Sequence, residues 1–177
     1  MIFVLFIGHI SFSQAVTFQL DLGPKWKYYQ DGRYADASVM GFSTQVFGGS
    51  KSIRLGVQAG FYRLKHQWEG QPDRYSSVIP MYLTASIIPK KLFLPVGDRY
   101  GLGLKMDLGG GALFSVGDIA SLGMCLEAGG GILVAEVGDD YSGFFIQAVY
   151  ENFLFTPYGS SISAGGLMGR IGVLIGH

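Results

Sequence analysis

The chain has 177 residues, of which 49% are hydrophobic and 15% are charged, and its 13 basic residues balance its 13 acidic ones. The balanced charge excludes the strongly basic surface of a typical nucleic-acid-binding protein, and the high apolar content excludes intrinsic disorder. A mean hydropathy of +0.32 is typical of membrane proteins, yet beyond the N-terminus no run reaches the roughly 18 apolar residues of a transmembrane helix. A closed barrel of strands is the other structure that can span a bilayer.

The N-terminal segment has the pattern of a secretory signal peptide. Residues 2–10 are almost entirely apolar, and the small residues Ser13 and Ala15 follow them. Small residues at these two positions favour cleavage after Ala15. We therefore assign residues 1–15 to a signal peptide and residues 16–177 to one barrel domain, with a short buried strand or helix as the alternative for the N-terminal segment.

Eight segments with a two-residue period follow along the chain. Each places bulky apolar side chains on one face and mainly glycine or polar side chains on the other, as a strand does. Most have 11 residues or more, and a tilted strand crosses a bilayer with about 9–11. The segments are residues 16–23, 37–47, 52–64, 75–88, 99–112, 122–137, 143–155 and 163–176.

The fifth segment shows the pattern most clearly, because Leu104, Met106 and Leu108 alternate with Lys105 and Asp107. A soluble protein would have a richly polar outer face, whereas the second face here is largely glycine. We therefore expect lipid outside and a narrow polar lumen inside. The predicted fold is all-β, an eight-stranded antiparallel up-and-down transmembrane β-barrel. A soluble lipocalin-like barrel with its apolar face inward is the alternative.

Two local features of the predicted strands allow further predictions. Pro80 cannot donate a ladder hydrogen bond and predicts a bulge or weakened pairing. Aromatic residues near the segment ends predict interfacial girdles. These aromatic residues are Trp26, Tyr28, Tyr29, Tyr75, Tyr100, Phe114, Phe153 and Phe155.

If the mature N-terminus starts in the periplasm, the connections between strands alternate between the outside of the cell and the periplasm. Residues 24–36, 65–74, 115–121 and 156–162 then face outward. The first two are long and mix aromatic with basic residues, which suits contacts with proteins, glycans or lipopolysaccharide headgroups. Of the inward connections, 89–98 is long and half apolar, and we expect it to pack under the barrel or on a partner. The candidate contact residues are Trp26, Tyr28, Tyr29, Tyr34 and Trp68.

The lumen of such a barrel is just wide enough for side chains to fill. The inward positions include three basic and four acidic residues, and buried charges must be paired. We therefore predict a structural ion network that plugs the lumen, with a gated proton or ion path as the alternative. The predicted members are Asp21, Arg54, Lys105, Asp107, Glu127, Glu151 and Arg170.

A family resemblance rests on V-I-P-M-Y-L-T-A-S at 78–86 and R-Y-G-L-G-L-K-M-D-L-G-G-G at 99–111. Over residues 16–176 the chain resembles the small outer-membrane β-barrel domains of Gram-negative bacteria, the OmpA/OmpX-like group. It is most similar in pattern to the barrel proteins common in Bacteroidota. The resemblance implies a cell outer membrane location and brings no catalytic signature with it.

We therefore expect an integral outer-membrane protein with a structural or interaction role, such as an accessory subunit of an outer-membrane complex. Its expected partners are outer-membrane lipid or lipopolysaccharide and a protein of that complex, and no nucleic acid. The alternatives are a narrow ion or small-solute channel and a lipid A-modifying enzyme. For the enzyme, His66 has Glu69, Asp73, Ser76 and Ser77 nearby in sequence, from which a nucleophilic relay could be built.

We expect no enzymatic activity, no cofactor and no metal site. A solvated loop histidine is the more common reading of His66. Cys125 is the only cysteine, so that neither an intramolecular disulfide nor a cysteine-based metal cluster can form. The glycine runs at 109–111 and 129–131 do not lead into a helix, which a phosphate-binding loop would need.

Overall fold

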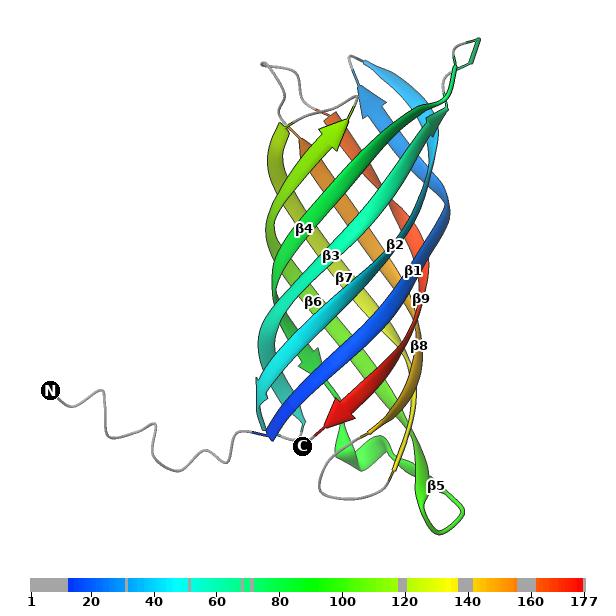
Figure 1. Cartoon of the computed structure of the whole chain (residues 1–177). Helices are drawn as coiled ribbons and strands as arrows, with labels where there is room; N and C mark the ends of the chain where they lie inside the picture. Colours follow the sequence, from blue (N-terminus) through cyan, green and yellow to red (C-terminus); the bar gives the residue numbers. More distant parts are fainter. Residues whose placement is uncertain are drawn as a thin grey trace, which may run out of the picture.

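The computed structural model describes residues 13–30, 32–50, 52–67, 69–70, 72–117, 121–136, 142–155 and 162–176. Eight long antiparallel strands form a closed barrel (Figure 1), as the sequence predicts. A 3-10 helix, η1 (Lys90–Leu92), and a short strand, β5 (Leu94–Val96), lie in one connection. The barrel strands are β1 (Ser13–Gln30), β2 (Arg33–Gly49), β3 (Ile53–Gln67), β4 (Arg74–Ile87), β6 (Tyr100–Gly117), β7 (Ser121–Glu136), β8 (Gly143–Phe155) and β9 (Ile162–Gly176).

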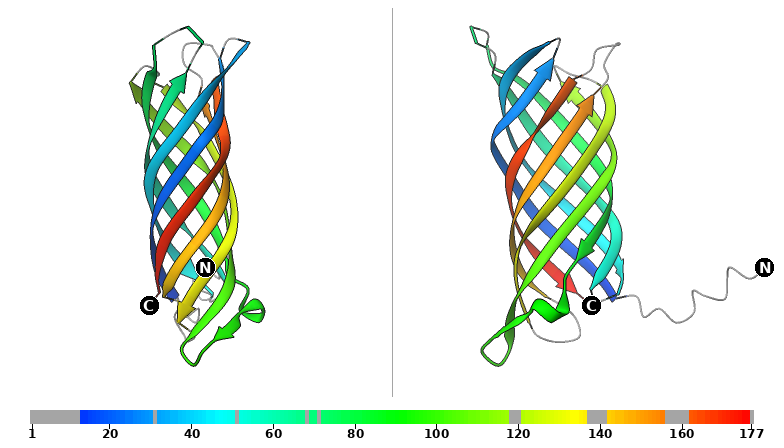
Figure 2. Two further views of the ribbon diagram at one scale, coloured as in Figure 1. Left: turned by 90° about the vertical axis from the view of Figure 1, so that its right-hand side faces the viewer. Right: turned by 180° about the vertical axis from the view of Figure 1, so that it is seen from behind.

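Each barrel strand pairs with the next one along the chain, and pairing of β1 with β9 joins the two ends of the sheet. The strands are strongly tilted (Figure 2), and β1 begins and β9 ends at the same end of the barrel. We call this the lower end, which also carries η1 and β5, and the opposite one the upper end. Among the described residues, no helix combines the length and the apolar content needed to cross a membrane.

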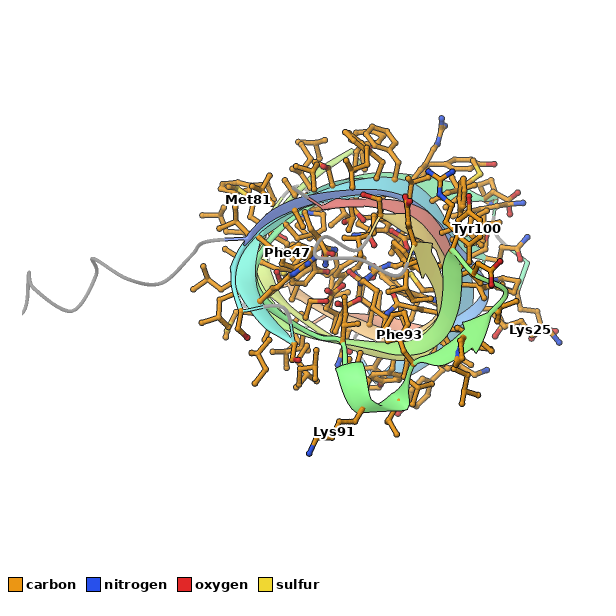
Figure 3. All side chains as sticks on the ribbon, turned by 90° about the horizontal axis from the view of Figure 1, so that it is seen from below. Lys25, Phe47, Met81, Lys91, Phe93 and Tyr100 are labelled. Carbon is orange, nitrogen blue, oxygen red and sulfur yellow. The ribbon has the colours of Figure 1, made fainter. Side chains whose placement is uncertain are left out.

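The outer wall is apolar and the inner wall is largely polar, with the alternation that the sequence predicts in all eight segments. Leu83, Leu122 and Phe144 point outward with 73%, 67% and 69% of their surface exposed. The charged residues that occupy inward positions of the strands are buried. Figure 3 shows Met81 and Tyr100 outside the ring of strands and Phe47 inside it. This is the reverse of a soluble barrel, so the lipocalin-like alternative is wrong.

The first outward loop predicted from the sequence, 24–36, is wrong, because most of it continues β1 and β2. Pairing with β2 passes from Gly23–Val39 to Trp26–Ala37, so that β1 holds one extra residue at this point. Such a bulge interrupts the alternation between faces. Odd-numbered residues of β1 face the lumen before the bulge, and even-numbered residues face it afterwards.

Pro80 weakens pairing on one side of β4 only, which confirms that expectation. The β3–β4 register runs from Ala59–Met81 to Tyr62–Val78 without pairs between them, while β4 and β6 stay paired through Pro80 and Leu113. A proline has no N–H for the ladder, so that one of the two neighbouring strands loses a hydrogen bond.

The predicted signal peptide lies mostly outside the described residues. Residues 1–12 are not among them, whereas Ser13 to Ala15 begin β1 and pair with Gly49 to Phe47 of β2.

Apolar side chains fill both ends of the lumen and leave a polar layer between them. Buried aromatic residues of the upper cluster include Trp26, Tyr28 and Phe153. The lower cluster includes Phe47, Leu133 and Phe145. Phe153 and Phe155 therefore lie inside the barrel, and Trp26 and Tyr28 do too, so their assignment to an interfacial girdle is wrong; the other four predicted girdle residues, Tyr29, Tyr75, Tyr100 and Phe114, are exposed on the outer wall.

The connection at 89–98 packs under the barrel through Phe93, which is partly buried against the lower cluster. Gly103 makes room for this ring, because a β-carbon at Gly103 would lie 2.6 Å from Phe93 Cζ. Leu92, Leu94 and Val96 of the same connection remain exposed.

Candidate functional site: the polar lumen and the upper rim

A buried ion cluster crosses the middle of the lumen. Arg170 on β9 is the register partner of Asp21 on β1, and its Nε donates to Asp21 Oδ1 at 2.5 Å. Its Nη2 donates to Glu127 Oε2 on β7 at 2.9 Å. All three side chains are buried. A buried charge is tolerated only when it is paired and hydrogen-bonded, and here one guanidinium holds two carboxylates.

Neutral side chains attach this cluster to further strands. Ser43 Oγ and Tyr62 OH donate to Asp21 Oδ2 at 3.0 and 2.7 Å. Gln58 Nε2 donates to Glu127 Oε2 at 3.2 Å. Both carboxylates therefore have partners on β2 or β3 as well as on β9.

A second ion pair lies nearer the lower cluster. Lys105 Nζ pairs with Asp107 Oδ2, two residues along the same face of β6. Gln147 Nε2 donates to Asp107 Oδ2 at 2.8 Å and to the main-chain oxygen of Lys105 at 3.3 Å. Lys105 Nζ also lies 4.4 Å from the centre of the Phe145 ring, a cation–π contact that suits an ammonium removed from water.

The remaining two predicted lumenal charges are also buried. Glu151 is the register partner of Glu127, and Tyr82 OH donates to Glu151 Oε1. Arg54 pairs in register with Ser86, whose partner on its other side is Asp107. The structure thus places all seven predicted residues inside the barrel and brings Asp21, Glu127 and Arg170 together in one cluster.

Several polar members of the lumen were not predicted from the sequence. All of them occupy inward positions of predicted strands, so that the two-residue period could have identified them. They are Ser43, Gln58, Tyr62, Tyr82 and Gln147. The prediction considered only the acidic and basic side chains, whereas amide and hydroxyl groups make many of the hydrogen bonds in the lumen.

Two of the predicted loop contacts lie inside the barrel, so their assignment to an outward loop is wrong. Trp26 is buried with its ring 5.4 Å from that of Phe153, and the buried Tyr28 lies 4.3 Å from the His66 ring, between centroids. The β1 bulge turns both side chains toward the lumen. Trp68 lies outside the described residues.

Tyr29 and Tyr34 do face outward at the upper rim. They are register partners on β1 and β2, and their ring centres lie 4.9 Å apart. Lys27 Nζ lies 3.0 Å from Asp36 Oδ1 in the next outward-facing pair of the same two strands. Aromatic and charged groups thus share the outer wall at this end.

His66 faces the lumen, where its Nε2 lies 3.2 Å from Ser76 Oγ. Asp73 instead lies 2.7 Å from Lys65 Nζ, and the hydrogen bond from Lys65 lowers the pKa of the Asp73 carboxyl. Because neighbouring residues of a strand point to opposite faces, Lys65 holds Asp73 on the outer side, away from His66. Of the residues named for the relay of a lipid A-modifying enzyme, Ser76 therefore lies beside His66, and Asp73 does not.

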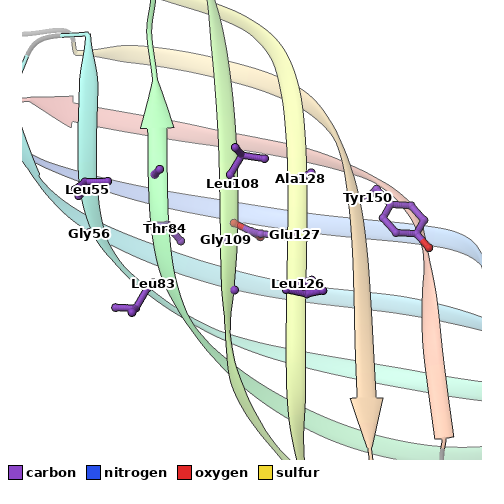
Figure 4. Close-up of a pocket in the computed structure, with 12 residues that line it drawn as sticks. Leu55, Gly56, Leu83, Thr84, Leu108, Gly109, Leu126, Glu127, Ala128 and Tyr150 are labelled. Carbon is purple, nitrogen blue, oxygen red and sulfur yellow. The ribbon is translucent and has the colours of Figure 1, made fainter.

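A shallow groove of about 790 Å³ lies on the outer wall over β3, β4, β6, β7 and β8 (Figure 4). Ala85, Gly110 and Ala128 leave room there between larger apolar side chains. Gly109 gives space to the lumenal Glu127, since a β-carbon at Gly109 would lie 2.9 Å from Glu127 Cγ. Within the described parts of the chain, no group of three or more His, Cys, Asp or Glu side chains could hold a metal ion.

Comparisons with known proteins find similarity at the level of solved structures. No model of a protein family matches the sequence, and no curated protein does. Neisserial surface protein A is 13% identical, with 90% of this chain and 96% of that chain covered and a TM-score of 0.43. Ail, the attachment invasion locus protein of Yersinia pestis, is 14% identical, with 93% and 99% covered and a TM-score of 0.37. The same protein in complex with the heparin analogue sucrose octasulfate has a TM-score of 0.41, at the same identity and coverage. At such identities and TM-scores, function has to be inferred from the residues of this chain.

Proposed function

We propose that the chain is an integral protein of the cell outer membrane whose closed barrel acts as a scaffold or accessory subunit and presents its upper rim to partners. The apolar outer wall supports this proposal, because a contiguous apolar surface of this extent is stable only against lipid or another apolar surface. The wall also has no free edge, so that its backbone groups are paired within the barrel, as a bilayer requires.

The membrane orientation follows from the position of the chain ends. We place the lower end in the periplasm and the upper rim, with Tyr29 and Tyr34, outside the cell. The barrel strands have 13 to 18 residues, whereas a tilted strand needs about 9–11 to cross the bilayer. The excess residues extend the wall beyond the membrane and can present side chains to a partner even where the connecting turns are short.

The observation that best supports a closed lumen is the buried cluster of Arg170, Asp21 and Glu127. A conducting pore would expose these side chains to water, but none of them has more than 5% of its surface exposed. Apolar clusters lie above and below the polar layer. This arrangement favours a scaffold over the narrow-channel alternative. Together with the sequence patterns at 78–86 and 99–111, it also supports affiliation with the OmpA/OmpX-like barrels, in the form common in Bacteroidota.

Electrical recording from planar bilayers tests the proposal. The protein is folded in detergent, its fold is checked by heat-modifiable migration on a gel, and it is inserted into the bilayer alone. A porin recorded in a separate bilayer is the positive control. We expect insertion without discrete conductance steps, because the buried ion cluster and the two apolar clusters fill the lumen. Regular unitary steps from the protein alone would contradict a closed barrel and favour the channel.

A further inference from the structure

A second groove, of about 570 Å³, lies on the outer wall beside the β1 bulge. The bulge forms one side of it, because Pro24 and Lys25 both point outward where a regular strand would turn one of them inward. Leu22, Pro24 and Met40 make up its apolar part. The groove therefore follows from the irregularity of β1 and is built into the wall.

Basic and aromatic side chains form the other part of this groove. Arg63 and Lys65 lie two residues apart on the outward face of β3, and Tyr75 of β4 is the register partner of Lys65. The Arg63 guanidinium carbon lies 4.8 Å from the centre of the Tyr75 ring. A guanidinium stacked in this way is oriented by the ring and still has N–H donors in its own plane.

The groove lies where the outer wall changes from apolar to charged. Toward the lower end, Phe61 and Ile79 are exposed on the same strands, and toward the upper end lies the Lys27–Asp36 ion pair. In the described upper halves of β6 to β9 the charged residues are Glu127 and Glu151, and both are buried in the lumen. The exposed basic groups at this level of the wall are therefore confined to the side that holds the groove.

We propose that this groove binds a phosphorylated lipid of the surrounding leaflet, with the phosphate on Arg63 and Lys65 and an acyl chain along Leu22 and Met40. The inference rests on the proposed function for the position of the groove in the bilayer. Guanidinium and ammonium groups match a phosphate in charge and hydrogen bonding. A lipid fits better than free phosphate, because the basic groups border an apolar surface that already faces the acyl chains.

Native mass spectrometry of the folded protein in detergent tests this site, with diphosphorylated lipid A, its dephosphorylated form and inorganic phosphate as probes. We expect the dephosphorylated lipid to bind about tenfold more weakly, because charge-assisted hydrogen bonds are lost. Inorganic phosphate should show no retained complex. The Arg63→Gln/Lys65→Gln variant should lose at least about tenfold in affinity for the phosphorylated lipid.

The matched control is Lys91→Gln/Arg99→Gln. It removes two exposed basic groups at the lower end, one of them paired with Glu136 as Lys65 is with Asp73. Its lipid affinity should equal that of the unmodified protein. Asp73→Asn removes the acid that competes for Lys65 and should tighten binding. Heat-modifiable migration confirms that each variant is folded.

Equal lipid affinity of the unmodified protein and the Arg63→Gln/Lys65→Gln variant would overturn the site, as would equal binding of the two lipids. Retention of inorganic phosphate as tight as that of the lipid would overturn the lipid as the occupant. These results differ from a failure of the proposed function, which would show as conductance steps or as failure to insert into a bilayer.

Discussion

Arg170 is the residue on which the polar layer of the lumen depends most. It binds Asp21 and Glu127 on two other strands. Removing one partner of a buried ion pair leaves the other charge without compensation, and this is far more costly than the pair is stabilising. Here a single substitution leaves two carboxylates in that state.

We therefore expect Arg170→Ala to lower the free energy of unfolding in detergent by about 3–5 kcal/mol. Urea titration followed by heat-modifiable gel migration and tryptophan fluorescence measures this change. Arg99→Ala is the control, because the Arg99–Glu136 pair is exposed and such pairs contribute about 0–1 kcal/mol. Similar losses in the two variants would contradict a structural role for the lumenal cluster.

The charged members of the lumen could be predicted from the sequence, but their partners could not. The inward position of Asp21 and Arg170 follows from the period of two in their own segments. Their contact joins residues 149 positions apart and depends on how β1 pairs with β9. Register is set by turns and by the β1 bulge, which local alternation does not specify.

At the scale of elements, β1 shows why the upper loops were overestimated. Below the bulge its apolar residues point outward, as Leu20 and Leu22 do. Above the bulge Lys27 points outward and Trp26 and Tyr28 point inward, as we expect where the outer wall leaves the proposed membrane and meets water. Above the bulge the alternation is thus that of a soluble barrel, with apolar side chains inside and polar side chains outside. The resulting mixture of lysine, aspartate and tyrosine at 24–36 resembles the sequence of a loop. The Gly23-Pro24 pair is a local signal of this irregularity.

The inward glycines reflect a second property of the strands, their close approach within a narrow barrel. A β-carbon at Gly131 would collide with the main-chain oxygen of Ile146 and lie 2.6 Å from the Gln147 Cα of β8. The adjacent Gly130 faces outward, and a β-carbon there would meet only Met106 Cγ at 3.9 Å.

We expect Gly131→Ala to lower the free energy of unfolding by about 1–3 kcal/mol through overpacking against the backbone. Gly130→Ala should leave it unchanged or raise it by up to about 1 kcal/mol, because alanine loses less conformational entropy on folding. Thermal unfolding in the same detergent compares the two variants. Equal effects at these neighbouring positions would contradict the assignment of their faces.

At the scale of the whole molecule, the bilayer explains which features could be predicted. Closure follows from the need to pair every backbone group in lipid, while the strand number and the opposite character of the two walls follow from the eight alternating segments. These are the confirmed parts of the prediction. A bilayer does not constrain what lies beyond it. There the predicted loop at 24–36 is mostly strand, whereas the 89–98 connection packs under the barrel through Phe93, as expected.

Photolabelling of the unmodified protein in vesicles is the most direct test of whether lipid covers the outer wall while the lumen is closed. A carbene precursor dissolved in the acyl-chain region is activated by light, and labelled side chains on β8 are mapped by peptide mass spectrometry. We expect label on Phe144, Ile146 and Tyr150, which are exposed outward, and none on Phe145, Gln147 and Val149, which are buried. Label on the second set, or no alternation along β8, would contradict it.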